Sequence, residues 1–137
     1  MPAGGGAAVQ LTRGGGQNPA ESFDGRTVYY LKGRNDSALW QVSAEGGDET
    51  RVFEAKVNAG NWAAVARGIY FLNRQSWAYA FEFFDFATHQ TTQITTPDGP
   101  RATFQLSGLT VSPDERWVLY TQRDKLDYDL MLVENFR

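Results

Sequence analysis

The chain repeats a turn-and-strand motif at a fixed distance. The sequences "ESFDGRTVYY" (21–30) and "VSPDERWVLYTQ" (111–122) share Ser, Asp, Arg and Tyr at matching positions. The matching pairs, each 90 residues apart, are Ser22 and Ser112, Asp24 and Asp114, Arg26 and Arg116, and Tyr30 and Tyr120. A weaker copy lies between them, where "GRTVYYLKG" (25–33) aligns with "ARGIYFLNR" (66–74) at a shift of 41 residues. A period of about 40–50 residues indicates an array of similar structural units.

Each unit carries strand signals and no helix signal. The runs "TVYYL" (27–31), "GIYFL" (68–72) and "WVLYT" (117–121) are β-branched and aromatic, which is the composition of buried strands. The chain has 14 glycines and 14% aromatic residues, a pairing that favours short strands joined by tight turns. The one helix-like window, residues 54–66, is interrupted by Gly60. The sequence therefore predicts an all-β chain.

We expect each unit to be a sheet of antiparallel strands. The expected strands are 19–23, 27–32, 38–43 and 49–53 in the first unit, 62–65, 68–73, 78–86 and 91–95 in the second, and 104–111, 116–121 and 128–133 in the third. The third unit lacks a fourth strand, but "VQLT" (9–12) at the start of the chain matches "TQIT" (92–95). Propellers close by joining their first and last segments in one sheet.

The expected organisation is therefore a short flexible segment followed by half of a propeller. The N-terminal segment is 1–7, and residues 8–137 form three blades. We expect the blades at about 13–53, 54–96 and 97–137, with strand 8–12 completing the last.

The segment "LTRGGGQNPAESFDGRTVYYLKGRNDSALWQVSAEGGDETRV" (11–52) resembles the TolB-like repeat, also called the WD40-like or PD40 repeat. That repeat has a Leu-Thr end, an S-P-D-G-R turn, two apolar strands and a Gly-Gly turn. The closing residues 108–137 resemble the C-terminal blades of bacterial proteins that join a winged-helix DNA-binding domain to a TolB-like propeller. Phe23 replaces the turn proline in the first unit, and Glu115 replaces the turn glycine in the third. The resemblance implies four-stranded blades with a sensing or protein-binding role and no catalytic residues.

Three blades are too few to close a ring, because propellers have about 4–8 blades. An open arc would expose two blade faces rich in aromatic side chains, which favours association. We therefore expect a homodimer that closes a six-bladed ring about a two-fold axis, with a trimeric nine-bladed ring as the poorer alternative. Strand exchange would place residues 8–12 of each chain beside residues 128–133 of the other. The expected interface residues are Val9, Gln10, Leu11, Thr12, Tyr128, Leu130, Met131, Leu132 and Val133.

The candidate catalytic groups favour structural roles. His89, the only histidine, lies in a turn-like segment, and the chain has no G-x-S-x-G motif to supply an activated serine. Glu82 and Asp85 lie three residues apart on one expected strand, so their side chains point to opposite faces and do not form a glycosidase pair. A further acidic group lacks the spacing of a calcium-binding loop. Its members are Asp124, Asp127 and Asp129.

The recurrence of Asp24 and Asp114 also indicates a structural role. An aspartate side chain accepts backbone N–H groups within its own turn, so we expect Asp24, Gly25 and Asp114 to be structural turn residues. An aromatic group is expected to pack mainly between blades, and part of it is a candidate lining for a ligand-binding channel mouth. Its members are Trp77, Tyr79, Phe81, Phe83, Phe84 and Phe86.

Composition narrows the classes of partner. The net charge is −3, with no basic block to neutralise phosphates, so we expect no nucleic-acid partner. No apolar run reaches the about 20 residues of a membrane span, and the chain has no cysteine. We expect a non-enzymatic propeller module that binds a protein or small ligand and self-assembles without a cofactor. The alternative is a glycosidase-like or lactonase-like hydrolase with its site in the central channel. The resemblance favours a bacterial soluble compartment, cytoplasm or periplasm.

Overall fold

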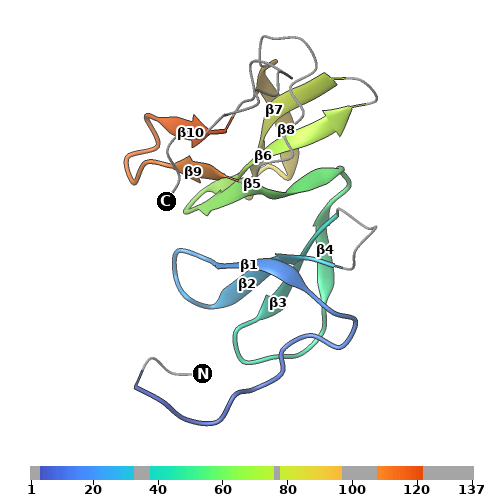
Figure 1. The fold of residues 1–137 in the computed structure, drawn as a ribbon, viewed down its shortest axis with the longest axis vertical. Helices are drawn as coiled ribbons and strands as arrows, with labels where there is room; N and C mark the ends of the chain where they lie inside the picture. The colour runs from blue at the N-terminus through green and yellow to red at the C-terminus, as the bar shows by residue number, and fades with distance from the viewer. Residues whose placement is uncertain (1–3, 33–37, 76–77, 97–107, 122–137) are drawn as a thin grey trace, which may run out of the picture.

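The computed structural model describes residues 4–32, 38–75, 78–96 and 108–121. These residues form ten β-strands, arranged in antiparallel sheets of four, four and two strands, and contain no helix (Figure 1). The expectation of an all-β chain is thus confirmed over the described residues. The same ranges contain no helix that is long and apolar enough to cross a membrane.

The first sheet is an up-and-down meander. Its strands, in the order in which they pair, are β1 (Gln17–Glu21), β2 (Thr27–Leu31), β3 (Leu39–Ser43) and β4 (Thr50–Phe53). The β3–β4 turn contains Gly46, whose N–H donates to the carbonyl of Ser43 at 2.9 Å. All four strands lie close to the expected ranges, because turn residues bound each strand on both sides.

The second sheet repeats the meander with longer strands. They are β5 (Val57–Val65), β6 (Gly68–Gln75), β7 (Ala78–Asp85) and β8 (Gln90–Thr95). β5 begins at Val57 and not near residue 62, because the pairing register shifts between Val57 and Trp62. Such a bulge breaks the two-residue alternation by which a strand is recognised in a sequence.

The third sheet is a hairpin of two short strands, β9 (Leu109–Val111) and β10 (Val118–Tyr120). Both strands are shorter than the expected ranges 104–111 and 116–121. Residues 104–107 and the expected strand 128–133 lie outside the described residues.

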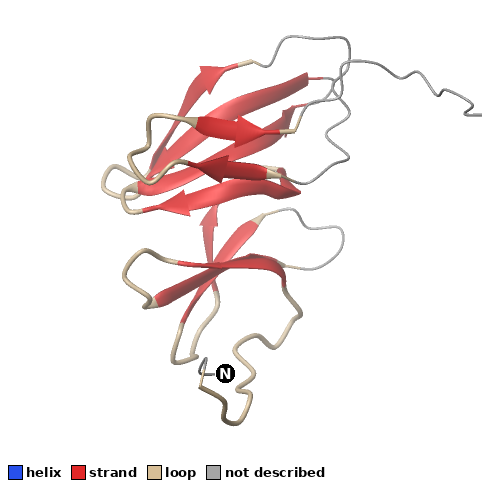
Figure 2. Cartoon of the chain, turned by 60° about the vertical axis from the view of Figure 1, so that its left-hand side comes forward, coloured by secondary structure: helices blue, strands red, loops and turns tan. Residues whose placement is uncertain are grey.

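The first and second sheets lie face to face (Figure 2). A largely aromatic core fills the space between them. Tyr29 and Leu31 of β2 share this buried cluster with Ile69 and Phe71 of β6. Phe53 of β4 stacks on Phe71, with 4.6 Å between the ring centroids.

A second core lies on the opposite face of the second sheet. Tyr70 and Leu72 alternate with Ile69 and Phe71 along β6, so they face the third sheet and cluster with Leu109. The second sheet is therefore buried on both faces, which explains why β6 reads as a continuous apolar run.

The first strands of the three sheets are neighbours. β5 contacts β1 on one side and β9 on the other. The N–H of Gly108, just before β9, donates to the carbonyl of Gly60 in β5 at 3.0 Å. The three sheets thus follow one another in chain order, with their first strands on a common side.

Candidate interaction surface

The β1–β2 turn is organised by the Asp24 carboxylate. Asp24 Oδ1 accepts hydrogen bonds from Ser22 Oγ at 2.7 Å and from the N–H of Arg26 at 3.1 Å. Ser22 Oγ in turn accepts the N–H of Thr27 at 2.9 Å. Gly25 has φ 72°, a left-handed conformation that glycine adopts without strain. The Ser22 hydroxyl, followed by the Arg26 N–H, lowers the pKa of Asp24.

The β9–β10 turn makes the same contacts. Asp114 Oδ1 accepts Ser112 Oγ at 2.5 Å and the N–H of Arg116 at 3.2 Å, and Ser112 Oγ accepts the N–H of Trp117 at 3.0 Å. Glu115 stands in the place of the turn glycine and has φ 54°. The pKa of Asp114 is lowered, chiefly by the Ser112 hydroxyl. Both aspartates are therefore held within their own turns.

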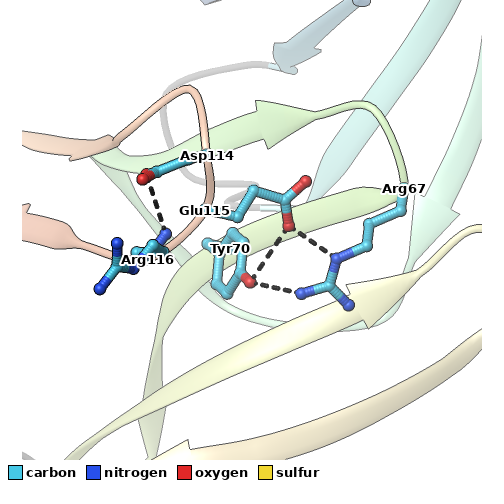
Figure 3. Close-up of polar contacts among 5 residues, drawn as sticks. All are labelled: Arg67, Tyr70, Asp114, Glu115 and Arg116. Atoms are coloured by element: carbon cyan, nitrogen blue, oxygen red, sulfur yellow. Dashed lines mark hydrogen bonds and ion pairs between the residues drawn. The ribbon is translucent and has the colours of Figure 1, made fainter.

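A polar cluster joins the β5–β6 turn to the β9–β10 turn (Figure 3). Arg67 Nε donates to Glu115 Oε2 at 2.6 Å, and Arg67 Nη2 donates to the Tyr70 hydroxyl at 2.7 Å. The guanidinium also lies 4.3 Å from the centroid of the Phe83 ring, within cation–π range. The Glu115 carboxylate is the main cause of the raised pKa of Arg67. The cluster cross-links the second and third sheets.

Glu82 and Asp85 have separate partners. The buried Glu82 accepts hydrogen bonds from Asn73 Nδ2 on its two carboxylate oxygens, at 3.2 and 3.1 Å. Asp85 Oδ1 accepts the N–H groups of Ala87 and Thr88 in the β7–β8 turn, which lower its pKa. Glu82 therefore binds a side chain of the neighbouring strand β6, whereas Asp85 stabilises the β7–β8 turn.

His89 and the aromatic group occupy structural positions. His89 lies in the β7–β8 turn with φ 54°, and its ring meets the edge of Phe84 at 6.0 Å between centroids. Phe84 and Phe86 lie in or against the core that faces the first sheet, and Tyr79, Phe81 and Phe83 in or against the core that faces the third. Trp77 and the acidic group at 124–129 lie outside the described residues. Within the described residues, no group of three or more acidic or histidine side chains could hold a metal ion.

The outer face of the third sheet is apolar and exposed. Tyr29, Tyr70 and Leu119 hold corresponding positions in the second strand of each sheet. Tyr29 and Tyr70 are each 6% exposed because they pack against the following sheet. Leu119 is 70% exposed and the neighbouring Trp117 is 68% exposed. The sequence contains a signal for this face. The run "WVLY" is apolar at successive positions, and successive side chains of a strand point to opposite faces, so both faces of the hairpin carry apolar side chains.

The outer face of the first sheet is covered by the chain itself. Tyr30 and Val42 point away from the second sheet, yet each is only 2% exposed. The segment 8–16, here called the N-terminal arm, runs on this side of the first sheet (Figure 1). The expectation that both end faces are exposed is therefore wrong for the first sheet.

The arm is anchored by backbone and charge. The N–H of Arg13 donates to Glu49 Oε1 at 2.7 Å, and Lys32 Nζ pairs with the other oxygen of the same carboxylate. Lys32 also lies 4.1 Å from the centroid of the Trp40 ring. Lys32 first, and then the Arg13 N–H and Tyr30, lower the pKa of Glu49 to about 2. Burial, followed by the adjacent Glu49 carboxylate, raises the pKa of Tyr30.

The expected interface residues fall into two groups. Residues 8–12 form no strand in the single chain. Val9 is exposed, Leu11 and Thr12 are half-buried, and Gln10 Nε2 donates to the carbonyl of Thr12 at 2.8 Å. The residues expected to pair with this segment lie outside the described part of the chain. They are Tyr128, Leu130, Met131, Leu132 and Val133.

Comparison with known proteins adds no assignment. No protein-family model matches the chain, and no curated protein sequence matches it significantly. The surfaces that bear on function are the outer faces of the first and third sheets.

Proposed function

We propose that the chain is a non-catalytic TolB-like β-propeller module, half of a six-bladed ring that forms when two copies pair. The completed ring would bind a protein or a small ligand. The observation that carries the proposal is the exposed position of Leu119. In the first two sheets the corresponding side chains, Tyr29 and Tyr70, are buried by the next sheet along the chain.

A second copy supplies the surface that the third sheet lacks. The second sheet receives Tyr29 on a face that carries Ile69 and Phe71. The first sheet carries Val28 and Tyr30 at the corresponding positions of β2, on its outer face. If the first sheet of a second copy packs against Leu119, the interface repeats the packing already present within the chain. Burial of an apolar side chain of this size contributes about 1.5–3 kcal/mol.

Two such contacts close the assembly. Each copy has one outer face on its first sheet and one on its third, so a head-to-tail pair satisfies all four faces and no filament grows. In the proposed ring the arm of each chain leaves its own first sheet, and residues 8–12 add a strand to the third sheet of the partner. The exposed side chain of Val9 is consistent with a segment that becomes buried only when the dimer forms.

The test is the mass of the particle in solution. We expect sedimentation velocity to give twice the chain mass at micromolar concentration. Leu119→Asp should raise the dissociation constant by about 30-fold or more, because it places a charge at the centre of the proposed interface. Ile94→Asp is the matched control: Ile94 is an exposed apolar residue on β8, outside both cores, so this variant should dimerise like the wild type.

Two results would count against the proposal in different ways. A wild-type chain that stays monomeric throughout the micromolar range contradicts the ring. A dimer whose affinity does not change when residues 1–12 are deleted contradicts the strand exchange and leaves face-to-face packing in place.

No specific observation favours the hydrolase alternative. Its candidate acid pair, Glu82 and Asp85, makes separate hydrogen bonds to Asn73 and to the β7–β8 turn. We therefore propose no reaction for this chain.

A further inference from the structure

The N-terminal arm occupies a place that a whole sheet occupies elsewhere in the molecule. On the second sheet, the face that carries Phe71 and Phe84 is covered by the first sheet. On the first sheet, Tyr30 and Val42 hold the corresponding positions, and they are equally buried although the described residues before β1 form no sheet. The arm provides this cover.

The contacts of the arm are close enough to exclude another occupant. A Cβ atom built on Gly16 would lie 2.9 Å from Cδ2 of the Tyr30 ring, and one built on Gly14 would lie 2.8 Å from Cε of Lys32. The backbone of the arm therefore runs directly against these side chains. The hydrogen bond from the Arg13 N–H to Glu49 fixes the residue immediately before Gly14.

We propose that the N-terminal arm is an intramolecular cap, and that it must leave Tyr30 before the third sheet of a second copy can dock on the first sheet. This inference rests on the proposed function, because the competing occupant is a second copy of this chain. The cap explains how a single chain protects one of its two open faces while it remains unpaired.

The two positions of the arm exclude each other. Residues 8–12 cannot extend to the third sheet of a partner while residues 13–16 cover Tyr30, since the partner's third sheet needs the same face. Because both copies must release their arms, the apparent association constant of the dimer is reduced by the square of the fraction of chains whose arm is undocked. Weakening the docked arm should therefore strengthen the dimer, whereas removing the exchanging strand should weaken it.

Two variants release the arm by different means. Glu49→Gln removes the charge that holds the Arg13 N–H and pairs with Lys32. Gly16→Leu leaves Glu49 intact and forces the arm off the buried Tyr30 ring. If either variant destabilises the first sheet for another reason, the second still tests the proposal.

Matched controls come from the same regions. Glu54→Gln removes a carboxylate just after β4 that pairs with Arg51. Gly4→Leu adds the same side chain near the N-terminus, where a Cβ on Gly4 meets nothing within 4 Å. Both controls should behave like the wild type.

The experiment combines two measurements on the full chain. Hydrogen exchange of the Arg13 amide at concentrations far below dimerisation reports the docked arm, and sedimentation velocity gives the dissociation constant. We expect Glu49→Gln and Gly16→Leu both to lose protection at Arg13 and to lower the dissociation constant. For Glu49→Gln the decrease should be about 100-fold, because the loss of one charge-assisted hydrogen bond weakens the docked arm about tenfold in each of the two copies. Deletion of residues 1–12 should change the constant in the opposite direction.

The possible failures are distinguishable. An unprotected Arg13 amide in the dilute wild type overturns the cap, because the arm is then not docked. Loss of protection with an unchanged or raised dissociation constant also overturns the cap but leaves the ring intact. If the wild type stays monomeric throughout the micromolar range, the ring fails, and the cap fails with it.

Discussion

Arg67 and Glu115 connect the second sheet to the third across 48 residues of sequence, with Arg67 Nε donating to Glu115 Oε2 at 2.6 Å. Glu115 makes this contact from a left-handed backbone conformation, φ 54°, at the turn position where Gly25 stands in the first sheet. Such a conformation costs a residue with a Cβ about 1–2 kcal/mol. The ion pair and the backbone of Glu115 therefore act in opposite directions on the stability of the third sheet.

The pair of variants Glu115→Ala and Glu115→Gly separates these two effects. Both lose the ion pair, which contributes about 0–1 kcal/mol because the Arg67 side chain is largely exposed. Glu115→Gly also relieves the left-handed backbone, so we expect it to be more stable than Glu115→Ala by about 1 kcal/mol. Urea unfolding at one fixed protein concentration measures the difference. Equal stability of the two variants would show that the turn carries no strain at this position.

The sheets, and the face to which each side chain points, could be predicted from the sequence. The alternation of side chains along a strand depends only on neighbouring residues. The 41-residue and 90-residue shifts place Tyr29, Tyr70 and Leu119 in register, and the structure gives all three corresponding positions. Alternation along β6 then separates residues of the two cores without further information.

The arm and its anchor could not be predicted. Residues 4–16 are rich in glycine and have no apolar period, so nothing in the sequence places them against Tyr30. The hydrogen bond from Arg13 to Glu49 spans 36 residues and depends on how the first sheet folds. The bulge in β5 could not be predicted from the sequence for a related reason, since an irregular pairing leaves no periodic pattern of apolar residues.

Acid should release the arm. Because Lys32 and the Arg13 N–H hold the pKa of Glu49 at about 2 in the folded chain, below its ordinary value of 4.5, the ionised carboxylate stabilises the docked arm. A lowered folded-state pKa means that this contribution is complete above about pH 4.5 and is lost as the pH falls toward about 2. The chemical shift of the Arg13 amide, followed by NMR from neutral pH into this window, reports the loss.

Glu49→Gln provides the control for this titration, because glutamine does not ionise. We expect the Arg13 amide of that variant to show no pH-dependent transition between about pH 4.5 and pH 2. A transition of the same size in the variant would assign the acid effect to another carboxylate.

Gly68 is required by close packing and not by its backbone conformation. A Cβ built on Gly68 would lie 2.1 Å from the carbonyl oxygen of Phe84 and 2.4 Å from Cζ of Phe83. The oxygen belongs to the paired strand β7 and cannot move without breaking the ladder. We expect Gly68→Ala to lower the free energy of unfolding by about 3 kcal/mol, as overpacking against backbone does. Gly4→Ala, which meets nothing within 4 Å, should leave the denaturation midpoint unchanged.

Asn61 lies in the middle of β5 and is fully buried, with a relative exposure of 0%. Among the described residues, neither its amide nitrogen nor its amide oxygen has a hydrogen-bond partner. A buried polar group without a partner costs about 1–3 kcal/mol, and an apolar side chain of similar shape does not incur this cost. We therefore expect Asn61→Leu to raise the free energy of unfolding by about 1 kcal/mol or more.

The matched variant is Asn73→Leu, on the neighbouring strand β6. Asn73 Nδ2 donates to both oxygens of the buried Glu82, so its loss leaves a buried carboxylate without those bonds. Asn73→Leu should lower the free energy of unfolding by about 1–3 kcal/mol, the opposite sign from Asn61→Leu. Denaturant unfolding of the two variants at equal protein concentration compares them directly. If Asn61→Leu is instead destabilising to a similar extent, the Asn61 amide has a hydrogen-bond partner in solution, and β5 carries a polar contact there.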